Sequence, residues 1–201
     1  MVDAAAKTLD ETPRAPSPRL HKALGTLSGG VGGAFGLAGL TVEVPVSTVL
    51  IMRSILDIAR AEGEVLADPA TRLAALEVFA LGGRADADDA AESGYYAMRA
   101  ALAGAVSEAA RHLAQQGLTQ EGAPALVRLI AMVAARYKVQ LTQKTAGMLV
   151  PGIGAAAGAS INLMFMNHFQ SVSRGHFTLR RLERRYGVDA VRDAYLDSGI
   201  R

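Results

Sequence analysis

The sequence predicts an all-α protein that folds as one compact helical domain. No segment alternates cleanly between apolar and polar residues, whereas apolar residues recur at helical spacing along almost the whole chain. Prolines and glycines fall where these helical patterns begin and end. With 201 residues, the chain is also long enough to bury one sizeable core.

The first 18 residues differ in composition from the rest of the chain. They contain acids and prolines and lack the apolar run of a signal peptide. Such a composition is typical of disorder. We therefore predict a disordered leader over residues 1–18, a helical domain over residues 19–201, and a cytoplasmic location by default.

The first helix of the domain is expected to begin near Leu20 and to run through a glycine-rich stretch at residues 25–45. Proline is tolerated in the first turn of a helix, so Pro45 should end this helix or open the next one. The apolar residues that follow predict a buried helix with Gly63 as its C-cap.

Further helix boundaries follow from the same signals. Asp68 is a candidate N-cap, Pro69 fits a first turn, and Gly187 should end a long helix before a short terminal one. The remaining expected helices begin near Tyr95 and Pro124, and a break is expected at Pro151.

The glycines lie at helical spacing. Gly25, Gly29 and Gly33 are four residues apart, as are Gly154 and Gly158, so each set shares one helix face. Each glycine costs about 1 kcal/mol relative to alanine inside a helix. Close backbone packing would explain this cost, and we predict that helices at 25–42 and 152–160 pack on each other in the core.

Two other interpretations of the glycines are open to the sequence. The glycine-rich helices could form a hairpin that dips into or spans a bilayer, because residues 145–166 contain no charge over 22 residues. Pro151 and Asn162 make that run a marginal membrane span. A phosphate-binding glycine loop is disfavoured, since no strand precedes the glycines.

Three polar residues in these apolar stretches form a candidate site. Glu43 ends the first glycine-rich stretch, Arg53 lies in an apolar helix, and Asn162 lies in the second glycine-rich helix. Buried Arg53 could neutralise Glu43. The simpler alternative is a local pair between Arg53 and Asp57, four residues further on.

Basic residues flank the apolar runs. Lys144 is the last charge before residues 145–166, and the stretch 174–201 contains seven arginines and four acids. The candidate contacts to anionic lipid or to a partner are Lys144, Arg180, Arg181, Arg184 and Arg185.

Composition excludes several classes of function. The net charge of +2 and the absence of a basic stripe with aromatics argue against nucleic-acid binding. The chain has no cysteine, so disulfides and thiolate metal sites are excluded. His168 and His176 lack nearby carboxylates at metal-binding spacing, and we expect no metal and no cofactor.

Three stretches combine in a fixed order: residues 29–64, with the glycine block and the helix around Arg53, then residues 68–83, then residues 144–187. Together they resemble the EcsC protein family, over about residues 20–197. That family is bacterial and is named for a protein encoded beside an ABC-transporter operon linked to secretion. The resemblance implies an association with transport or secretion and brings no catalytic residues.

We therefore expect a non-enzymatic protein at the cytoplasmic face of the inner membrane, peripheral or partly inserted. Its partner would be an anionic membrane surface or a membrane protein. The alternative is a soluble hydrolase-type enzyme with a site where the two glycine-rich helices meet. A third possibility is an interaction module whose Gly/Ala surface docks a partner's helix.

Overall fold

The computed structural model describes residues 2–12, 14–81, 95–96, 99–100, 102, 104–108 and 154–198. Its helices are α1 (Val2–Ala6), α2 (Pro18–Ala34), α3 (Gly36–Ala61), α4 (Pro69–Leu81), α7 (Gly154–Tyr186) and α8 (Val188–Asp197). The described part of the chain contains no strand, which confirms the predicted all-α class.

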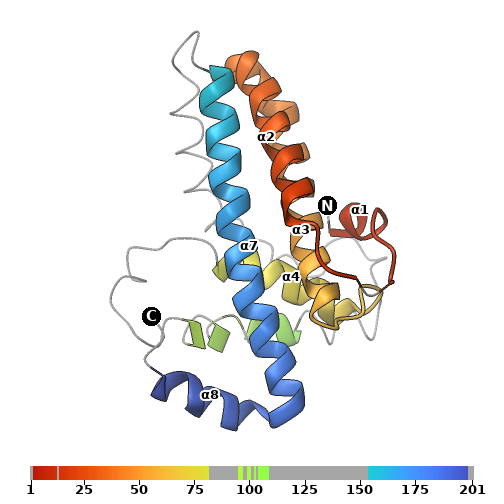
Figure 1. Cartoon of the computed structure of the whole chain (residues 1–201), viewed down its shortest axis with the longest axis vertical. Helices are drawn as coiled ribbons and strands as arrows, with labels where there is room; N and C mark the ends of the chain where they lie inside the picture. Colours follow the sequence, from red (N-terminus) through yellow and green to blue (C-terminus); the bar gives the residue numbers. More distant parts are fainter. Residues whose placement is uncertain are drawn as a thin grey trace.

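Helices α2, α3 and α7 run along the long axis of the molecule (Figure 1). Helix α2 makes its most extensive contacts with α7 and also packs on α3. The junction of α2 and α3 lies at the same end as the start of α7. We call this end, residues 23–46 and 154–164, the tip, and we call the opposite end, with α4, α8 and the end of α7, the base.

The glycines of α2 allow its backbone to touch α7. A methyl group at Gly29 would overlap the carbonyl oxygen of Gly158 and would lie 2.7 Å from Nδ2 of Asn162. A methyl group at Gly25 would lie 3.1 Å from Cε of Met166. The predicted packing of the two Gly/Ala-rich helices on each other is therefore confirmed.

The break in the glycine-rich stretch lies earlier than the sequence indicates. Helix α2 ends at Ala34, Phe35 forms the turn, and α3 begins at Gly36 and continues through Pro45. The prediction that Pro45 ends or opens a helix is wrong. Proline removes one backbone hydrogen bond at a cost of about 3 kcal/mol, and the buried second half of this 26-residue helix offsets that cost.

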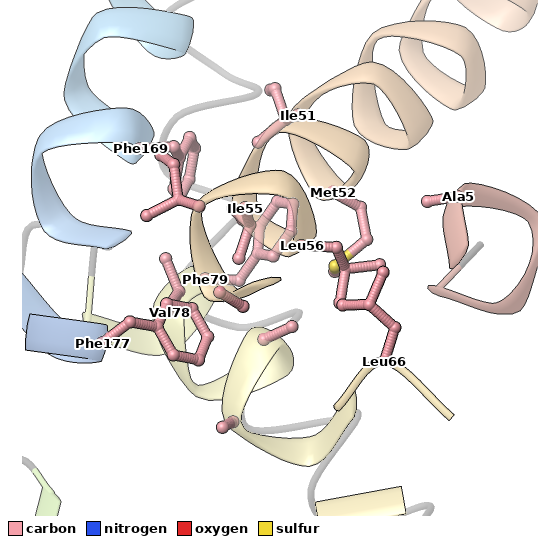
Figure 2. Packing of buried hydrophobic residues seen from close by; sticks show 14 of the residues in the cluster. Ala5, Ile51, Met52, Ile55, Leu56, Leu66, Val78, Phe79, Phe169 and Phe177 are labelled. Atoms are coloured by element: carbon pink, nitrogen blue, oxygen red, sulfur yellow. The ribbon is translucent and has the colours of Figure 1, made fainter. Parts of the chain in front are cut away.

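Large side chains fill the core towards the base (Figure 2). The rings of Phe79 on α4 and Phe169 on α7 lie 4.8 Å apart, and both are buried. Ile55 and Leu56 of α3 complete this contact. The core therefore joins α3, α4 and α7 through side chains rather than through backbone contact.

The predicted disordered leader is not what the structure shows. Residues 2–6 form α1, Ala5 is fully buried, and α1 packs against α3 and α4. The apolar residues that face the core are Val2, Ala5, Ala6 and Leu9. Their spacing of i, i+3, i+4 and i+7 is that of an amphipathic helix, a pattern that the acids and prolines of residues 1–18 obscure.

The helix ends predicted at Gly63, Asp68 and Gly187 are confirmed. Gly63 and Gly187 have φ values of 84° and 90°, a left-handed conformation that favours glycine after a helix. Oδ1 of Asp68 accepts a hydrogen bond of 2.9 Å from the backbone N–H of Ala70, as an N-cap does. The expected helix after Pro124 and the break at Pro151 lie outside the described residues.

Candidate functional site

The fold gathers charge-free chain at the tip. Residues 23–42 and 44–52 contain no charged residue, and residues 154–173 contain no Asp, Glu, Lys or Arg. The exception between the first two stretches is Glu43, whose side chain is only 3% exposed. The described surface of the tip therefore presents no formal charge to its surroundings.

Large apolar side chains are exposed on this surface. Phe35 is 72% exposed at the turn, and Val42 and Val31 beside it are 68% and 61% exposed. Among the tip residues whose side chains are described, the other large apolar residues that are exposed are Leu24, Leu27, Val46, Leu163 and Met164. Contiguous apolar surface of this kind marks contact sites for proteins, ligands or membranes.

A groove of about 580 Å³ lies between α2 and α3 at the tip. Its lining residues are Leu27, Ser28, Val31, Gly32, Phe35, Val42, Glu43 and Val46. This volume is within the range of small-molecule pockets, which are mostly apolar with a few polar groups. The side chain of Glu43 lies at the bottom of this groove because Gly32 has no side chain. A methyl group at Gly32 would lie 2.5 Å from Cβ of Glu43 and would clash with it.

Two of the three predicted site residues meet beneath this groove. Nδ2 of Asn162 donates to Oε1 of Glu43 at 2.6 Å and to the carbonyl oxygen of Gly25 at 2.9 Å. Glu43 and Asn162 are both buried. One amide thus serves all three tip helices, and the contact fixes how α2, α3 and α7 pack.

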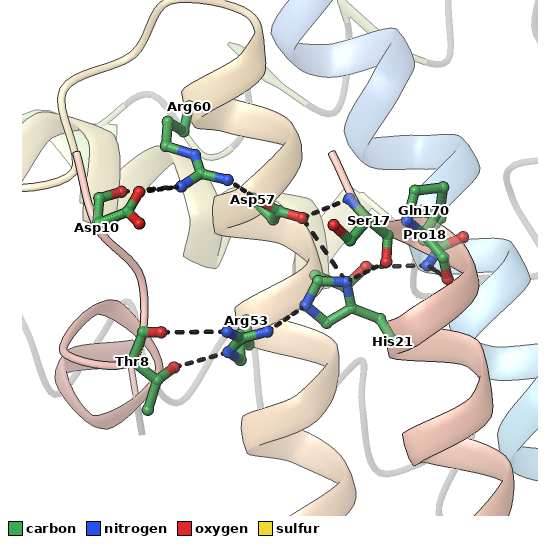
Figure 3. Close-up of polar contacts among 10 residues, drawn as sticks. Thr8, Asp10, Ser17, Pro18, His21, Arg53, Asp57, Arg60 and Gln170 are labelled. Carbon is green, nitrogen blue, oxygen red and sulfur yellow. Dashed lines mark hydrogen bonds and ion pairs between the residues drawn. The ribbon is translucent and has the colours of Figure 1, made fainter. Parts of the chain in front are cut away.

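Arg53 is not part of this contact. It lies ten residues beyond Glu43 on α3, about 15 Å along the helix axis, and hydrogen bonds to Thr8 and His21 (Figure 3). The predicted cluster is therefore divided between two places. The alternative pair with Asp57 is not formed either, because Asp57 binds Arg60 and the backbone N–H of Ser17.

Most of the predicted lipid-contacting arginines form ion pairs at the base. Arg180 lies 3.0 Å from Glu64, Arg184 also binds Glu64, and Arg181 lies 2.9 Å from Glu62. Burial favours the neutral form of Glu64, but the two arginines outweigh it and lower the pKa of this carboxyl group. The paired arginines therefore fasten α7 to the end of α3.

The remaining predicted contacts differ. The guanidinium group of Arg185 lies 5.4 Å from the centre of the Tyr186 ring, and both side chains are exposed. Lys144 lies outside the described residues.

The sequence did not indicate a second buried polar cluster, at the base. The hydroxyl group of Tyr95 lies 3.0 Å from Nδ1 of His176, and Nε2 of His176 lies 3.6 Å from Glu77. Burial lowers the pKa of His176 to about 3 and raises the pKa values of Glu77 and Tyr95. A tyrosine with a raised pKa is not an activated nucleophile.

No helix of the described residues is both long enough and apolar enough to cross a membrane. Within the same residues, no three His, Asp or Glu side chains are grouped as a metal site requires.

The fold and the site define a helical protein whose three long helices meet in a glycine-packed tip, where the described residues expose no charged side chain. A model of the EcsC protein family matches residues 3–182, and the chain therefore belongs to the EcsC protein family. The match begins at residue 3, within α1, in agreement with the packed position of this helix. No curated protein and no solved structure matches the chain.

Proposed function

We propose that this EcsC protein is a non-enzymatic protein that binds the cytoplasmic face of the inner membrane through its tip. The observation that carries the proposal is the exposed apolar surface around Phe35, at a tip whose described residues expose no charged side chain. Burying such side chains in a lipid interface is favourable by about 25 cal/mol per Å² of apolar surface removed from water.

The position of this surface supports shallow insertion. The junction of α2 and α3 lies at one end of the long axis (Figure 1), so the tip can enter a membrane while the base stays in water. The groove between α2 and α3 opens among the same apolar residues. It offers an acyl chain a place beside Val31 and Val42, two exposed residues of that surface.

The basic end of α7 is a poorer candidate for the first contact. From Met164 to Arg181 the helix rises about 25 Å, so tip and base cannot touch one flat surface while α7 stands upright on it. Arg180, Arg181 and Arg184 are already paired with acids. Lipid contact through Arg185 and its neighbours stays a prediction. The hydrolase alternative also stays a prediction, and of its three proposed site residues only Glu43 and Asn162 lie together.

Vesicle flotation tests the proposal with matched variants. Val31→Ser with Phe35→Ser removes two exposed apolar side chains from the tip, and Tyr186→Ser with Val188→Ser removes two of similar exposure from the base. We expect the tip variant to lose at least tenfold in binding to anionic vesicles and the base variant to bind like the unmodified chain. Equal binding by both variants, or no binding by the unmodified chain, would contradict the proposal.

A further inference from the structure

The N-terminal segment, residues 2–12, is held in place by polar contacts, and we call it the strap. Its contacts are Asp3 with Arg72 (2.7 Å), Thr8 with Arg53 (2.8 and 3.1 Å), Asp10 with Arg60 (2.8 Å), and Glu11 with the backbone N–H groups of Leu66 (3.1 Å) and Ala67 (2.9 Å). Prolines at positions 13, 16 and 18 separate the strap from the body of α2.

One buried histidine stands behind these contacts. His21 is 1% exposed, and its Nδ1 lies 2.9 Å from the carbonyl oxygen of Ser17. Its Nε2 lies 2.8 Å from Nη1 of Arg53. A guanidinium group can only donate, so Nε2 must accept and the proton must be on Nδ1. The geometry therefore requires a neutral imidazole.

We propose that the strap is a pH-sensitive element, which is released from α3 when His21 takes up a proton on Nε2. Protonation replaces the acceptor of the Arg53 hydrogen bond with a second donor and places two positive groups in contact. Arg53 is also the residue that holds Thr8, through its hydroxyl group and its carbonyl oxygen (Figure 3). When Arg53 turns away from the imidazolium, the strap loses both contacts.

The charges around His21 fit this direction. Burial is the main cause that lowers the pKa of His21, Asp57 at 3.8 Å opposes it, and Arg53 and Arg60 of α3 add to it. Asp57 is itself bound by Arg60, which in turn binds Asp10 of the strap.

The nearest polar group of α7 in this network does not titrate. It is the amide of Gln170, which donates to the carbonyl oxygen of Pro18 at 3.1 Å and to Ser54 at 3.0 Å. The closed strap thus resists protonation of His21, whereas an exposed histidine has a pKa near 6.5. Below that pH, opening of the strap is accompanied by uptake of a proton by His21, so acid favours the open form.

Cysteine labelling measures this opening, because the chain has no cysteine of its own. Ala5→Cys places a thiol on the buried, core-facing side of the strap itself, and Val78→Cys places one in the core on α4. Labelling rates are divided at each pH by the rate for Ala190→Cys, an exposed position on α8. Val78→Cys then reports global unfolding, and Ala5→Cys reports opening of the strap.

We expect the normalised labelling of Ala5→Cys to rise between pH 6.5 and 5, by up to tenfold per pH unit because one proton is taken up. Val78→Cys should stay protected over this range. In the His21→Gln background the rise should disappear, because glutamine can accept from Arg53 but does not titrate. His168→Gln, at an exposed histidine of α7, should keep the rise.

Three results would overturn the proposal: a pH-independent rate in the unmodified background, an unchanged rise in His21→Gln, or labelling of Val78→Cys in step with Ala5→Cys. If His21→Gln does not fold, Arg53→Gln provides the test. That variant should label rapidly at every pH. Slow labelling with the original pH dependence would then be the contradicting result.

Discussion

The tip and the base hold helices together in different ways. At the tip, Gly29 and Gly158 bring two backbones into contact, and a single amide, that of Asn162, joins three helices. At the base, Phe79 and Phe169 fill the space between helices, and ion pairs such as Arg180–Glu64 cover the edges. Backbone contact leaves the large apolar side chains of the tip, including Phe35, facing outward.

This difference explains why glycine is used at a known cost in helix stability. A helix that packs through glycines buries little of its own side-chain surface, so its leucines and valines are available for another contact. A helix that packs through phenylalanines uses that surface in the core. The tip is therefore suited to bind something apolar, and the base is suited to hold the fold.

The largest difference in stability is expected between alanine variants of a phenylalanine at the base and one at the tip. Phe169→Ala at the base should lower the free energy of unfolding by about 3–5 kcal/mol, because it removes a fully buried ring and leaves a cavity. Phe35→Ala at the exposed tip should change it by less than about 0.5 kcal/mol. Urea denaturation measures both, and similar losses for the two variants would remove the distinction between tip and base.

Substitution of two glycines by alanine should change the free energy of unfolding in opposite directions, and by less than Phe169→Ala does. Gly29→Ala should destabilise the protein by about 1–3 kcal/mol, since the new methyl group overlaps the backbone of α7. Gly175→Ala, in the body of α7 with nothing within 4 Å of the new methyl group, should stabilise it by about 0.5–1 kcal/mol. Thermal and urea unfolding give the signs, and stabilisation by Gly29→Ala would show that the helices are not in contact there.

The base should respond to pH through two buried groups, His176 and Glu77. The pKa of His176 is about 3 in the folded chain and near 6.5 when unfolded, so its contribution is fully present above pH 6.5 and is lost as pH falls. From pH 6.5 to 5.5 this loss is about 1 kcal/mol. The raised pKa of Glu77 acts in the opposite direction, because stability from that group is lost as pH rises.

Comparison of the unmodified chain with His176→Gln isolates the histidine. The difference between their urea midpoints should shrink as the pH falls from 6.5 to 5.5. A constant difference over this range would mean that His176 does not titrate between the two states as described.

Local signals in the sequence were sufficient for several elements. A helix end can be specified by one residue alone. Gly63 and Gly187 do so through their positive φ values, and Asp68 does so through its hydrogen bond to the backbone of Ala70, so these ends could be predicted without knowing any distant contact. The spacing of Gly25 and Gly29 likewise predicted a close contact with another helix, which the structure confirms.

Long-range contacts decided the rest. The partner of Arg53 could not be predicted, because Thr8 and His21 are 45 and 32 residues away in the chain. Tyr95 and His176 are 81 residues apart. The glycine pattern predicted that Glu43 and Asn162 lie near each other. Arg53 follows Glu43 by ten positions on the same helix, and this separation places the arginine in another part of the molecule.

The most direct test of membrane contact through the tip uses a fluorescent reporter, because the chain contains no tryptophan. Phe35→Trp places a reporter at the tip, and Tyr186→Trp places one at the basic end of α7. With anionic vesicles, we predict a blue shift in the emission of the tip reporter and no shift for the base reporter. A shift confined to the base reporter would contradict the account.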